Sequence, residues 1–189
     1  MKTAQLVKTA LLIIDIQNDY FPGGKMTLEN TTEASNNAAA LLSTFRRMQL
    51  PVIHIQHIAR HADATFFLPN TEGAKIHKSV APLSNEAVII KNYPNSFRQT
   101  ALLEYLKEHQ IAKLVIAGMM THMCIDSTTR AAFDLGFDIQ LAHDACATKA
   151  LSFGGAEIPA SHVQNAYIAA LDGSFAQALS TQEIVADLG

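Results

Sequence analysis

The sequence predicts an α/β protein with a doubly wound, mostly parallel sheet of five or six strands and helices on both faces, in a Rossmann-like three-layer arrangement. Short apolar runs alternate along the chain with segments whose apolar residues recur at helical spacing. Most of these runs are nearly continuous in Ile, Val and Leu, which is typical of strands buried on both faces of a parallel sheet. No repeat or linker divides the 189 residues, so we expect a single domain over residues 1–189.

The predicted strands are apolar runs that end at a turn or a polar residue. They cover residues 10–15, 51–56, 87–91, 113–118 and 137–144. A sixth strand is expected near residues 175–179. Because helical segments separate the strands, neighbouring strands are expected to run parallel, joined by crossover helices.

The predicted helices are recognised by apolar residues three or four positions apart. In residues 33–48, Ala34, Ala38, Leu41 and Phe45 fall on one face of a helix. Further helices are expected over residues 97–109, 123–135, 160–171 and 183–188. Gly136 follows the helix predicted over residues 123–135, at a position where glycine commonly ends a helix.

Residues 58–86 show no sustained period and contain Pro69, Gly73 and Pro82. A connection of this length in a compact domain usually has a function or covers a site. We therefore expect this segment to act as a lid. The alternative is that it holds short elements that periodicity does not reveal.

The composition limits the classes of partner and compartment. The net charge of -3 provides no basic surface for nucleic acid or an anionic membrane, so we expect a small-molecule substrate and neither of those partners. Two cysteines do not make a disulfide framework and fit a reducing compartment. The apolar run after Lys8 is too short for a signal peptide, so a cytoplasmic location is expected.

Three polar residues, Asp15, Lys91 and Cys124, directly follow or end apolar strand runs. Ligands of open parallel sheets bind beyond the carboxyl ends of the strands. These residues are far apart in the sequence but are expected at one rim of the sheet. Asp15 and Lys91 alone could form a simple structural ion pair, whereas the addition of Cys124 favours a functional site.

Cys124 follows the small-residue turn of "AGMMTHMC" and is predicted in the first turn of the helix that ends near Gly136. Unsatisfied N–H groups and the helix dipole there favour a thiolate, which would make Cys124 a nucleophile. The alternative is a buried cysteine that behaves as a small hydrophobic residue. Nothing in the sequence around Cys146 indicates activation, so it is expected to be such a residue.

Four histidines near the end of the second strand raise the question of a metal site. They are His54, His57, His61 and His77. No acidic residue lies between Val52 and Arg60, and the histidine spacing matches no strong ligand motif. We therefore expect no metal and no other cofactor. His122 lies two residues before Cys124 at a turn, so the two side chains are expected to point in different directions.

Taken together, these residues resemble the isochorismatase-like cysteine hydrolase superfamily, which includes nicotinamidases, N-carbamoylsarcosine amidases and streptothricin hydrolases. "LLIIDIQNDYF" resembles the family's opening strand, with its catalytic aspartate at Asp15. "VIIKNYPNSF" resembles the lysine strand, with its lysine at Lys91. "VIAGMMTHMCIDSTTRAAFDLGFDIQLAHDACAT" resembles the nucleophile turn and the elements after it, with the nucleophile at Cys124.

The resemblance implies a fold that agrees with the one predicted above. It also implies a cis peptide bond between Met119 and Met120 and an oxyanion hole formed by the backbone N–H groups of Met120 and Cys124. A homodimer or homotetramer is expected from the family, and the apolar composition is consistent with a subunit interface.

Two features limit which family activity the chain is expected to have. Nicotinamidases of this family hold a metal with an acidic residue and two histidines after the second strand, whereas here Gln56 or His57 stands where the aspartate is expected. True isochorismatases work without the cysteine, so the presence of Cys124 argues against isochorismate.

The predicted function is therefore hydrolysis of a small amide, or another non-peptide C–N bond, through a thioester formed by an Asp–Lys–Cys triad. The alternatives are isochorismatase-type cleavage of a vinyl ether and a non-catalytic binding module on the same fold. The residues expected to line the substrate pocket are Gln17, Phe21, Phe97, His122 and Phe153.

Overall fold

A computed structural model describes residues 8–189, and its centre is a sheet of six parallel strands. The strands are β1 (Lys8–Ile14), β2 (Val52–His57), β3 (Ala87–Lys91), β4 (Ile111–Met119), β5 (Asp138–Ala147) and β8 (Gln177–Leu179). Their order across the sheet is β3-β2-β1-β4-β5-β8, and every neighbouring pair is parallel. The predicted α/β class and the sixth strand are confirmed.

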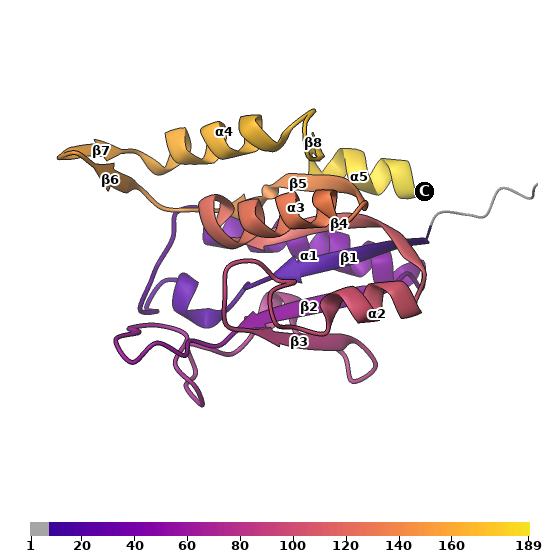
Figure 1. Cartoon of the computed structure of the whole chain (residues 1–189), viewed down its shortest axis with the longest axis horizontal. Helices are drawn as coiled ribbons and strands as arrows, with labels where there is room; N and C mark the ends of the chain where they lie inside the picture. The colour runs from indigo at the N-terminus through magenta and orange to yellow at the C-terminus, as the bar shows by residue number, and fades with distance from the viewer. Residues whose placement is uncertain (1–7) are drawn as a thin grey trace, which may run out of the picture.

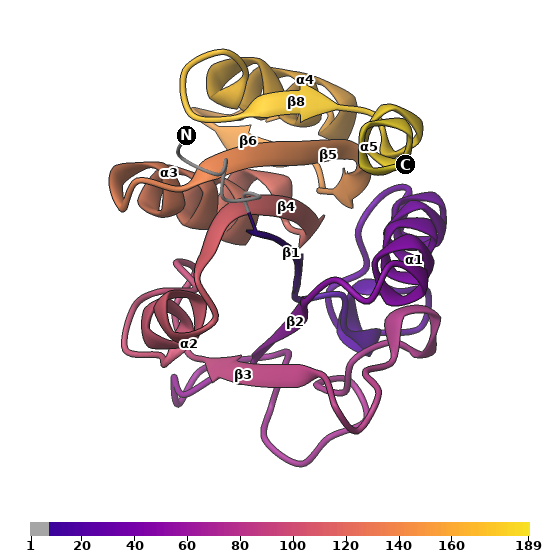
Figure 2. The ribbon, with the colours of Figure 1, turned by 90° about the vertical axis from the view of Figure 1, so that its right-hand side faces the viewer.

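Five helices cover the two faces of this sheet (Figures 1 and 2). They are α1 (Thr31–Arg47), α2 (Leu102–Glu108), α3 (Asp126–Asp134), α4 (Ala160–Leu171) and α5 (Thr181–Leu188). Figure 2 shows α1 and α5 on one side of the sheet and α2 and α3 on the other. Apolar residues of α4 belong to the same core as those of α2 and α3, which completes three layers.

The alternation of side chains along β1 explains why the molecule has a core on each face. Leu11 and Ile13 point into the core under α1, and Leu12 and Ile14 point into the core under α2 and α3. All four are buried. A strand that is apolar at every position therefore contributes side chains to the hydrophobic cores on both faces of the sheet.

The β3 strand differs from its prediction, because it is the edge of the sheet and is buried on one side only. Val88 and Ile90 are 43% and 57% exposed. An unbroken apolar run indicates a strand but does not reveal whether a helix covers each face. A second difference is an antiparallel hairpin of β6 (Leu151–Phe153) and β7 (Ala156–Ile158), which the sequence did not predict and which projects beyond α4 in Figure 1.

Residues 58–86 contain the short 3-10 turns of η2 (Lys78–Val80) and otherwise irregular backbone. Hydrogen bonds attach the segment to the chain just after β1. Asn18 N–H donates to Lys75 O, Asp19 N–H donates to Gly73 O, and His77 N–H donates to Ile16 O, at 2.9 to 3.0 Å. The segment is therefore anchored across the carboxyl end of β1.

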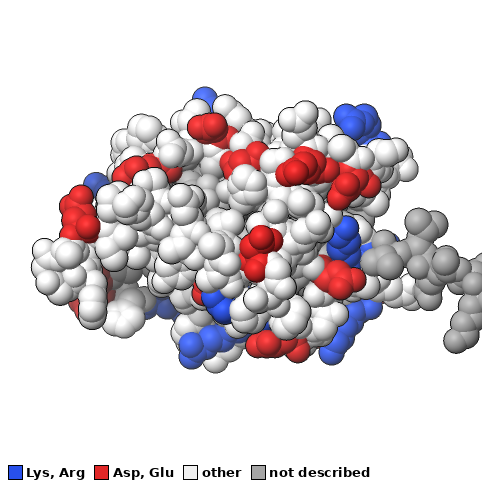
Figure 3. Space-filling model, turned by 90° about the horizontal axis from the view of Figure 1, so that it is seen from above, with Lys and Arg blue, Asp and Glu red and all other residues white. Residues whose placement is uncertain are grey.

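The surface seen from above in Figure 3 carries acidic and basic side chains scattered among uncharged residues. No continuous basic area crosses this face. Among the described residues, no helix has the length and apolar character needed to cross a membrane.

Candidate active site

The strand order places the candidate residues at the point where the sheet changes winding direction. From β1 the chain adds β2 and β3 on one side, and then crosses to add β4 on the other side of β1. Asp15 directly follows β1, Lys91 ends β3, and Cys124 lies in the π-helical turn η3 (Thr121–Ile125) after β4. In doubly wound sheets this switch point forms the ligand crevice.

Gly118 allows β4 to approach β1 closely at this point. Its φ angle is +139°, and a Cβ atom there would overlap the backbone carbonyl oxygen of Ile14. Asp15, which follows Ile14 in the chain, has a φ angle of +52° and donates its N–H to Ile55 O at 3.0 Å. The positive φ angles of Gly118 and Asp15 therefore let the carboxyl ends of β1 and β4 lie close together.

The three candidate residues meet around the ammonium group of Lys91. Lys91 Nζ lies 2.6 Å from Asp15 Oδ2 and 3.2 Å from Cys124 Sγ. It also contacts Tyr93 O at 3.1 Å and His57 Nδ1 at 3.0 Å. Asp15, Lys91 and Cys124 are at most 4% exposed, and we refer to these three as the Asp–Lys–Cys cluster.

The Asp15 carboxylate forms an ion pair with Lys91, but the hydrogen-bonding capacity of its two oxygens is not filled. Neither of its buried oxygens accepts a hydrogen bond of good geometry from any described residue. A buried carboxylate in this condition is costly unless it has a role that needs free lone pairs. Asp15 is thus available to take a proton from the neighbouring thiol.

The charge state of Cys124 differs from the prediction. Burial raises the pKa of the Cys124 thiol, the negative charge of Asp15 raises it further, and the positive charge of Lys91 offsets this only in part. Burial lowers the pKa of Lys91, but the negative charge of Asp15 and the contacts with Asp15 and Cys124 outweigh burial, and the net pKa is raised. The resting state is therefore a neutral thiol beside an Asp–Lys ion pair, because desolvation dominates over the helix terminus.

The backbone before Cys124 forms a wide turn. The peptide between Met119 and Met120 is cis. The carbonyl oxygen of Met120 accepts hydrogen bonds from the N–H groups of Met123, at 3.1 Å, and Ile125, at 3.2 Å. The N–H of Cys124, between these two donors, does not donate to that oxygen.

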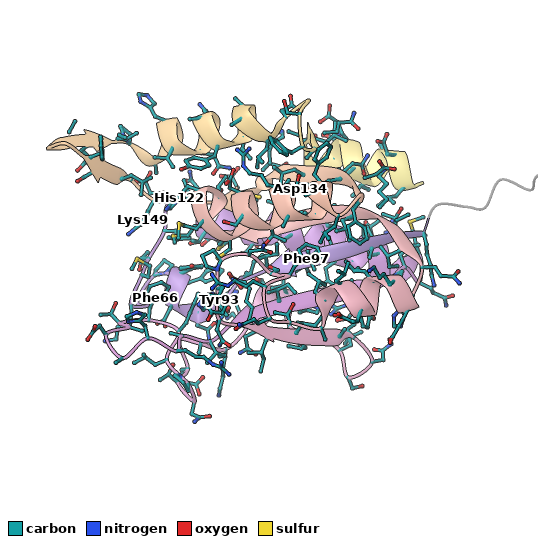
Figure 4. All side chains as sticks on the ribbon, in the orientation of Figure 1. Phe66, Tyr93, Phe97, His122, Asp134 and Lys149 are labelled. Atoms are coloured by element: carbon teal, nitrogen blue, oxygen red, sulfur yellow. The ribbon has the colours of Figure 1, made fainter. Side chains whose placement is uncertain are left out.

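A cavity of about 380 Å³ is lined by His57 and Tyr93, two residues that contact the Lys91 ammonium, but by none of the three cluster residues themselves. Its lining consists of His57, Ala59, Arg60, His61, Ala64, Phe66, Phe67, Asn92 and Tyr93. Figure 4 labels Phe66 and Tyr93, two of the lining residues, near each other on the lower left side of the molecule. Most of these lining residues come from residues 58–86, and the expected role of that segment as a lid stays a prediction.

None of the five residues predicted to bind substrate lines this cavity. Gln17 is fully buried, and its amide is engaged with the backbone of His57 and Ala74. Phe21 stacks on the His77 ring, with a centroid distance of 3.7 Å. Both side chains hold residues 58–86 in place.

The other three predicted binding residues lie elsewhere in the fold. Phe97 packs toward Phe137 in the core under α2 and α3. His122 bonds Thr148 Oγ1 through Nδ1 at 2.6 Å, and does not pair with Cys124, as expected from the turn. Phe153 is 86% exposed on the β6–β7 hairpin.

The residues that sequence reasoning missed are the aromatic pair Phe66–Phe67 and Tyr93. Tyr93 follows Lys91 by two positions, so its place at the rim of the sheet could have been inferred. Phe66 and Phe67 lie in the irregular segment, where no periodicity assigns a direction to a side chain.

The four histidines considered as metal ligands do not converge. His54 bonds Glu86 Oε2 at 3.0 Å, and His77 bonds Ser79 Oγ at 2.8 Å. The side chain of His61 is 87% exposed. Only His57 reaches the cluster.

The residues with ligand atoms close enough to share an ion are Asp15, His57 and Cys124, within 4.8 Å of one another in the described chain. However, Lys91 Nζ contacts an atom of each of them. This ammonium already supplies the positive charge at their centre, so the donor set does not fit a metal together with Lys91.

The arrangement has the parts needed for nucleophilic catalysis. A thiol lies near a carboxylate that can accept its proton, and a cation lies within reach of both. Buried ionisable groups that lie beside a cavity and have perturbed pKa values are typical of functional sites.

Comparison with known proteins identifies relatives over nearly the whole chain. The isochorismatase domain matches residues 9–183. The chain is 52% identical to the isochorismatase family protein YddQ of Bacillus subtilis, over 92% of this chain and 97% of that protein. It is 30% identical to a streptothricin hydrolase of Streptomyces noursei, over 74% of this chain and 49% of that protein.

Among solved structures, an isochorismatase hydrolase from Oleispira antarctica superimposes with a TM-score of 0.93. The two proteins are 48% identical, and the match covers 97% of this chain and 99% of the other.

Proposed function

Because the chain belongs to the isochorismatase family of hydrolases, we propose that it is a cysteine-dependent hydrolase that cleaves the C–N bond of a small amide through a thioester on Cys124. The observation that carries this proposal is the contact of Lys91 Nζ with both Asp15 Oδ2 and Cys124 Sγ inside a buried site. A purely structural role would leave three ionisable groups buried at a considerable cost in desolvation.

In the first half of the reaction, Asp15 takes the thiol proton of Cys124 as the sulfur attacks the carbonyl carbon of the amide. The carbonyl oxygen becomes negatively charged and accepts hydrogen bonds from the N–H groups of Met120 and Cys124. Asp15 then gives the proton to the nitrogen, the C–N bond breaks, and ammonia or an amine leaves. Cys124 now carries the acyl group as a thioester.

In the second half, Asp15 takes a proton from water, whose oxygen attacks the thioester carbonyl. The C–S bond breaks and the proton returns to the sulfur, which releases the acid and restores the thiol. The Lys91 ammonium forms an ion pair with Asp15 Oδ2 at 2.6 Å and stabilises negative charge on the sulfur.

The test is hydrolysis of primary amides, carbamoyl compounds and lactams by the native protein and by Cys124→Ala. We expect the native protein to release ammonia, an amine or an acid, and Cys124→Ala to lose this activity while keeping its far-UV circular dichroism spectrum. An active Cys124→Ala protein would end the thioester mechanism.

Isochorismate is the substrate that distinguishes the alternative vinyl-ether reaction from the proposed amide hydrolysis. Pyruvate release from isochorismate that survives Cys124→Ala would favour isochorismatase chemistry, in which Asp15 acts as an acid without the thiol.

A further inference from the structure

His57 lies between the Asp–Lys–Cys cluster and the adjacent cavity. It is the last residue of β2, and its Nδ1 atom is 3.0 Å from Lys91 Nζ. The same ring lines the 380 Å³ cavity, where it lies 5.8 Å from the ring of Phe67. No other residue of that lining contacts the Lys91 ammonium through its side chain.

The backbone of His57 is held on both sides by one buried amide. Gln17 Oε1 accepts a hydrogen bond from His57 N–H at 2.7 Å, and Gln17 Nε2 donates to His57 O at 2.9 Å. Gln17 Nε2 also donates to Ala74 O at 2.7 Å. Gln17 therefore positions His57 and part of residues 58–86 together, which explains why a polar side chain is fully buried two residues after Asp15.

The contact with Lys91 determines which nitrogen of His57 carries the proton. An ammonium group has three hydrogens and no lone pair, so Nδ1 of His57 must be the acceptor. A neutral imidazole then carries its only hydrogen on Nε2. Burial lowers the pKa of His57, and the charge of Lys91 lowers it further, which is consistent with the neutral form.

The Nε2–H group of His57 is free to bind a ligand. Among the described residues, none forms a hydrogen bond with Nε2, and the ring borders the cavity. The neighbouring cavity wall is largely apolar, since it is formed by Ala59, Ala64 and the rings of Phe66 and Phe67. The lining also contains the polar side chains of Arg60, His61 and Asn92. Among the lining side chains, His57 is the one that contacts Lys91, and its ring lies within 4.8 Å of Cys124.

We propose that His57 is a substrate-binding residue whose Nε2–H donates to an acceptor on the acyl part of the substrate, in the tautomer imposed by its contact with Lys91. This proposal rests on the proposed function. It narrows the substrate class to amides that carry a second hydrogen-bond acceptor on a flat or apolar acyl group. Small binding sites commonly use this combination of an apolar wall and a few oriented polar groups.

The first test is binding of four amides of the same shape to Cys124→Ala, measured by calorimetry. Benzamide has no ring acceptor, whereas picolinamide, nicotinamide and isonicotinamide place one ring nitrogen at different positions. We expect at least one pyridine amide to bind about fivefold to tenfold more tightly than benzamide, as one hydrogen bond would give. Equal affinities for all four, or no binding by any, would overturn the proposal.

Two substitutions at His57 separate its two contacts. In the Cys124→Ala background, His57→Asn keeps an acceptor near the Nδ1 position but loses the donor, and His57→Gln keeps a donor near the Nε2 position. We expect His57→Asn to bind all four amides alike and His57→Gln to retain part of the preference. A preference that persists in His57→Asn would show that the residue only positions Lys91.

His162, exposed on α4, provides the matched control, and His162→Asn should bind the four amides like its parent. The tautomer is tested without any ligand, by ¹⁵N NMR of the histidines, where His57 should carry its hydrogen on Nε2. Binding preference without turnover by the native protein would contradict the proposed hydrolase and leave the role of His57 intact. Turnover in a protein that binds benzamide and its pyridine analogues equally would support the proposed hydrolase and contradict the role of His57.

Discussion

At the scale of single residues, Cys124 is a thiol whose reactivity depends on the charges beside it. The sequence suggested activation by a helix terminus, but burial and Asp15 both raise the thiol pKa. In the proposed mechanism, Asp15 therefore takes the thiol proton as the sulfur attacks the substrate, and no stable thiolate is needed beforehand. A resting thiol also limits unproductive oxidation or alkylation, since the thiolate is the reactive form.

Asp15→Asn provides opposite predictions for labelling and for catalysis. Removal of the carboxylate charge lowers the pKa of Cys124, so alkylation by iodoacetamide at pH 7 should become about tenfold faster for each unit by which the pKa falls. Amide hydrolysis should be lost, because the proton acceptor is gone. Labelling is followed by mass spectrometry of the intact protein.

Lys91→Met is the matched comparison and should label more slowly than the native protein, since it removes the charge that favours the thiolate. Cys146 should stay unlabelled at pH 7, because burial raises its pKa to about 12. An Asp15→Asn protein that labels no faster than the native one would contradict the assigned effect of Asp15.

Gly118 is a second residue on which the site depends, because the close approach of β4 to β1 leaves no room for a Cβ atom there. Gly118→Ala would place a methyl group against the Ile14 carbonyl at a φ angle of +139°, so β1 and β4 would have to separate. We expect a loss of about 3 kcal/mol or more in the free energy of unfolding, measured with urea. Gly136→Ala, where a Cβ would meet open space at a φ angle of +88°, is the control and should be the milder change.

At the scale of elements, a partly buried ion cluster joins α1, β2 and the loop that precedes β3. Glu86 forms a two-point contact with Arg46, at 2.7 and 2.8 Å, and also accepts from Leu83 N–H at 2.8 Å. His54 Nε2 lies 3.0 Å from the same carboxylate. The cluster links α1 to β2 and to the loop before β3, while Val88 and Ile90 on the edge strand stay exposed.

The Glu86 cluster should make stability depend on pH. The hydrogen bonds from Arg46 lower the pKa of Glu86 to about 2, against burial, and those from Leu83 and His54 act in the same direction. A lowered carboxyl pKa stabilises the fold above the ordinary value near 4.5 and loses that effect as the pH falls toward 2. We expect Glu86→Gln to lose about 1–2 kcal/mol at pH 7, with little difference from native near pH 2.

Urea unfolding at a series of pH values measures this difference. Glu183→Gln, at an exposed helix cap, is the control and should show a smaller change at pH 7. A Glu86→Gln deficit that is equally large at pH 2 and pH 7 would rule out the charge as its source.

At the scale of the whole molecule, the uncovered apolar side chains are consistent with self-association. Val88 and Ile90 on the edge strand and Phe153 on the hairpin are 43%, 57% and 86% exposed. Apolar surface of this kind commonly marks an interface. We expect light scattering to give a mass at least twice the 20.5 kDa of one chain, and Ile90→Lys or Phe153→Ser to lower it.

Phe133→Ser, on the exposed side of α3, serves as the control for loss of a surface aromatic residue. A native mass of one chain, or masses unchanged in both interface variants, would contradict this expectation.

Much of the architecture could be read from the sequence because it depends on local pattern. The apolar runs and helical periods are set by burial and by backbone geometry, so they located the six strands of the main sheet and the five helices to within five residues, the largest error being the start of α2. The β6–β7 hairpin was missed because its strands are short and exposed and therefore have no apolar pattern. The edge position of β3 was missed because one strand contains no information about its neighbours.

For the candidate site, the sequence alone predicts that Asp15, Lys91 and Cys124 share one rim, because parallel strands bring their carboxyl ends to the same edge of the sheet. The charge state of the thiol, the burial of Gln17 and the contact of His57 with Lys91 emerge only from the folded molecule. Each of these depends on desolvation and on distances between segments far apart in the chain. Such quantities are set by packing in three dimensions, and no spacing along the sequence encodes them.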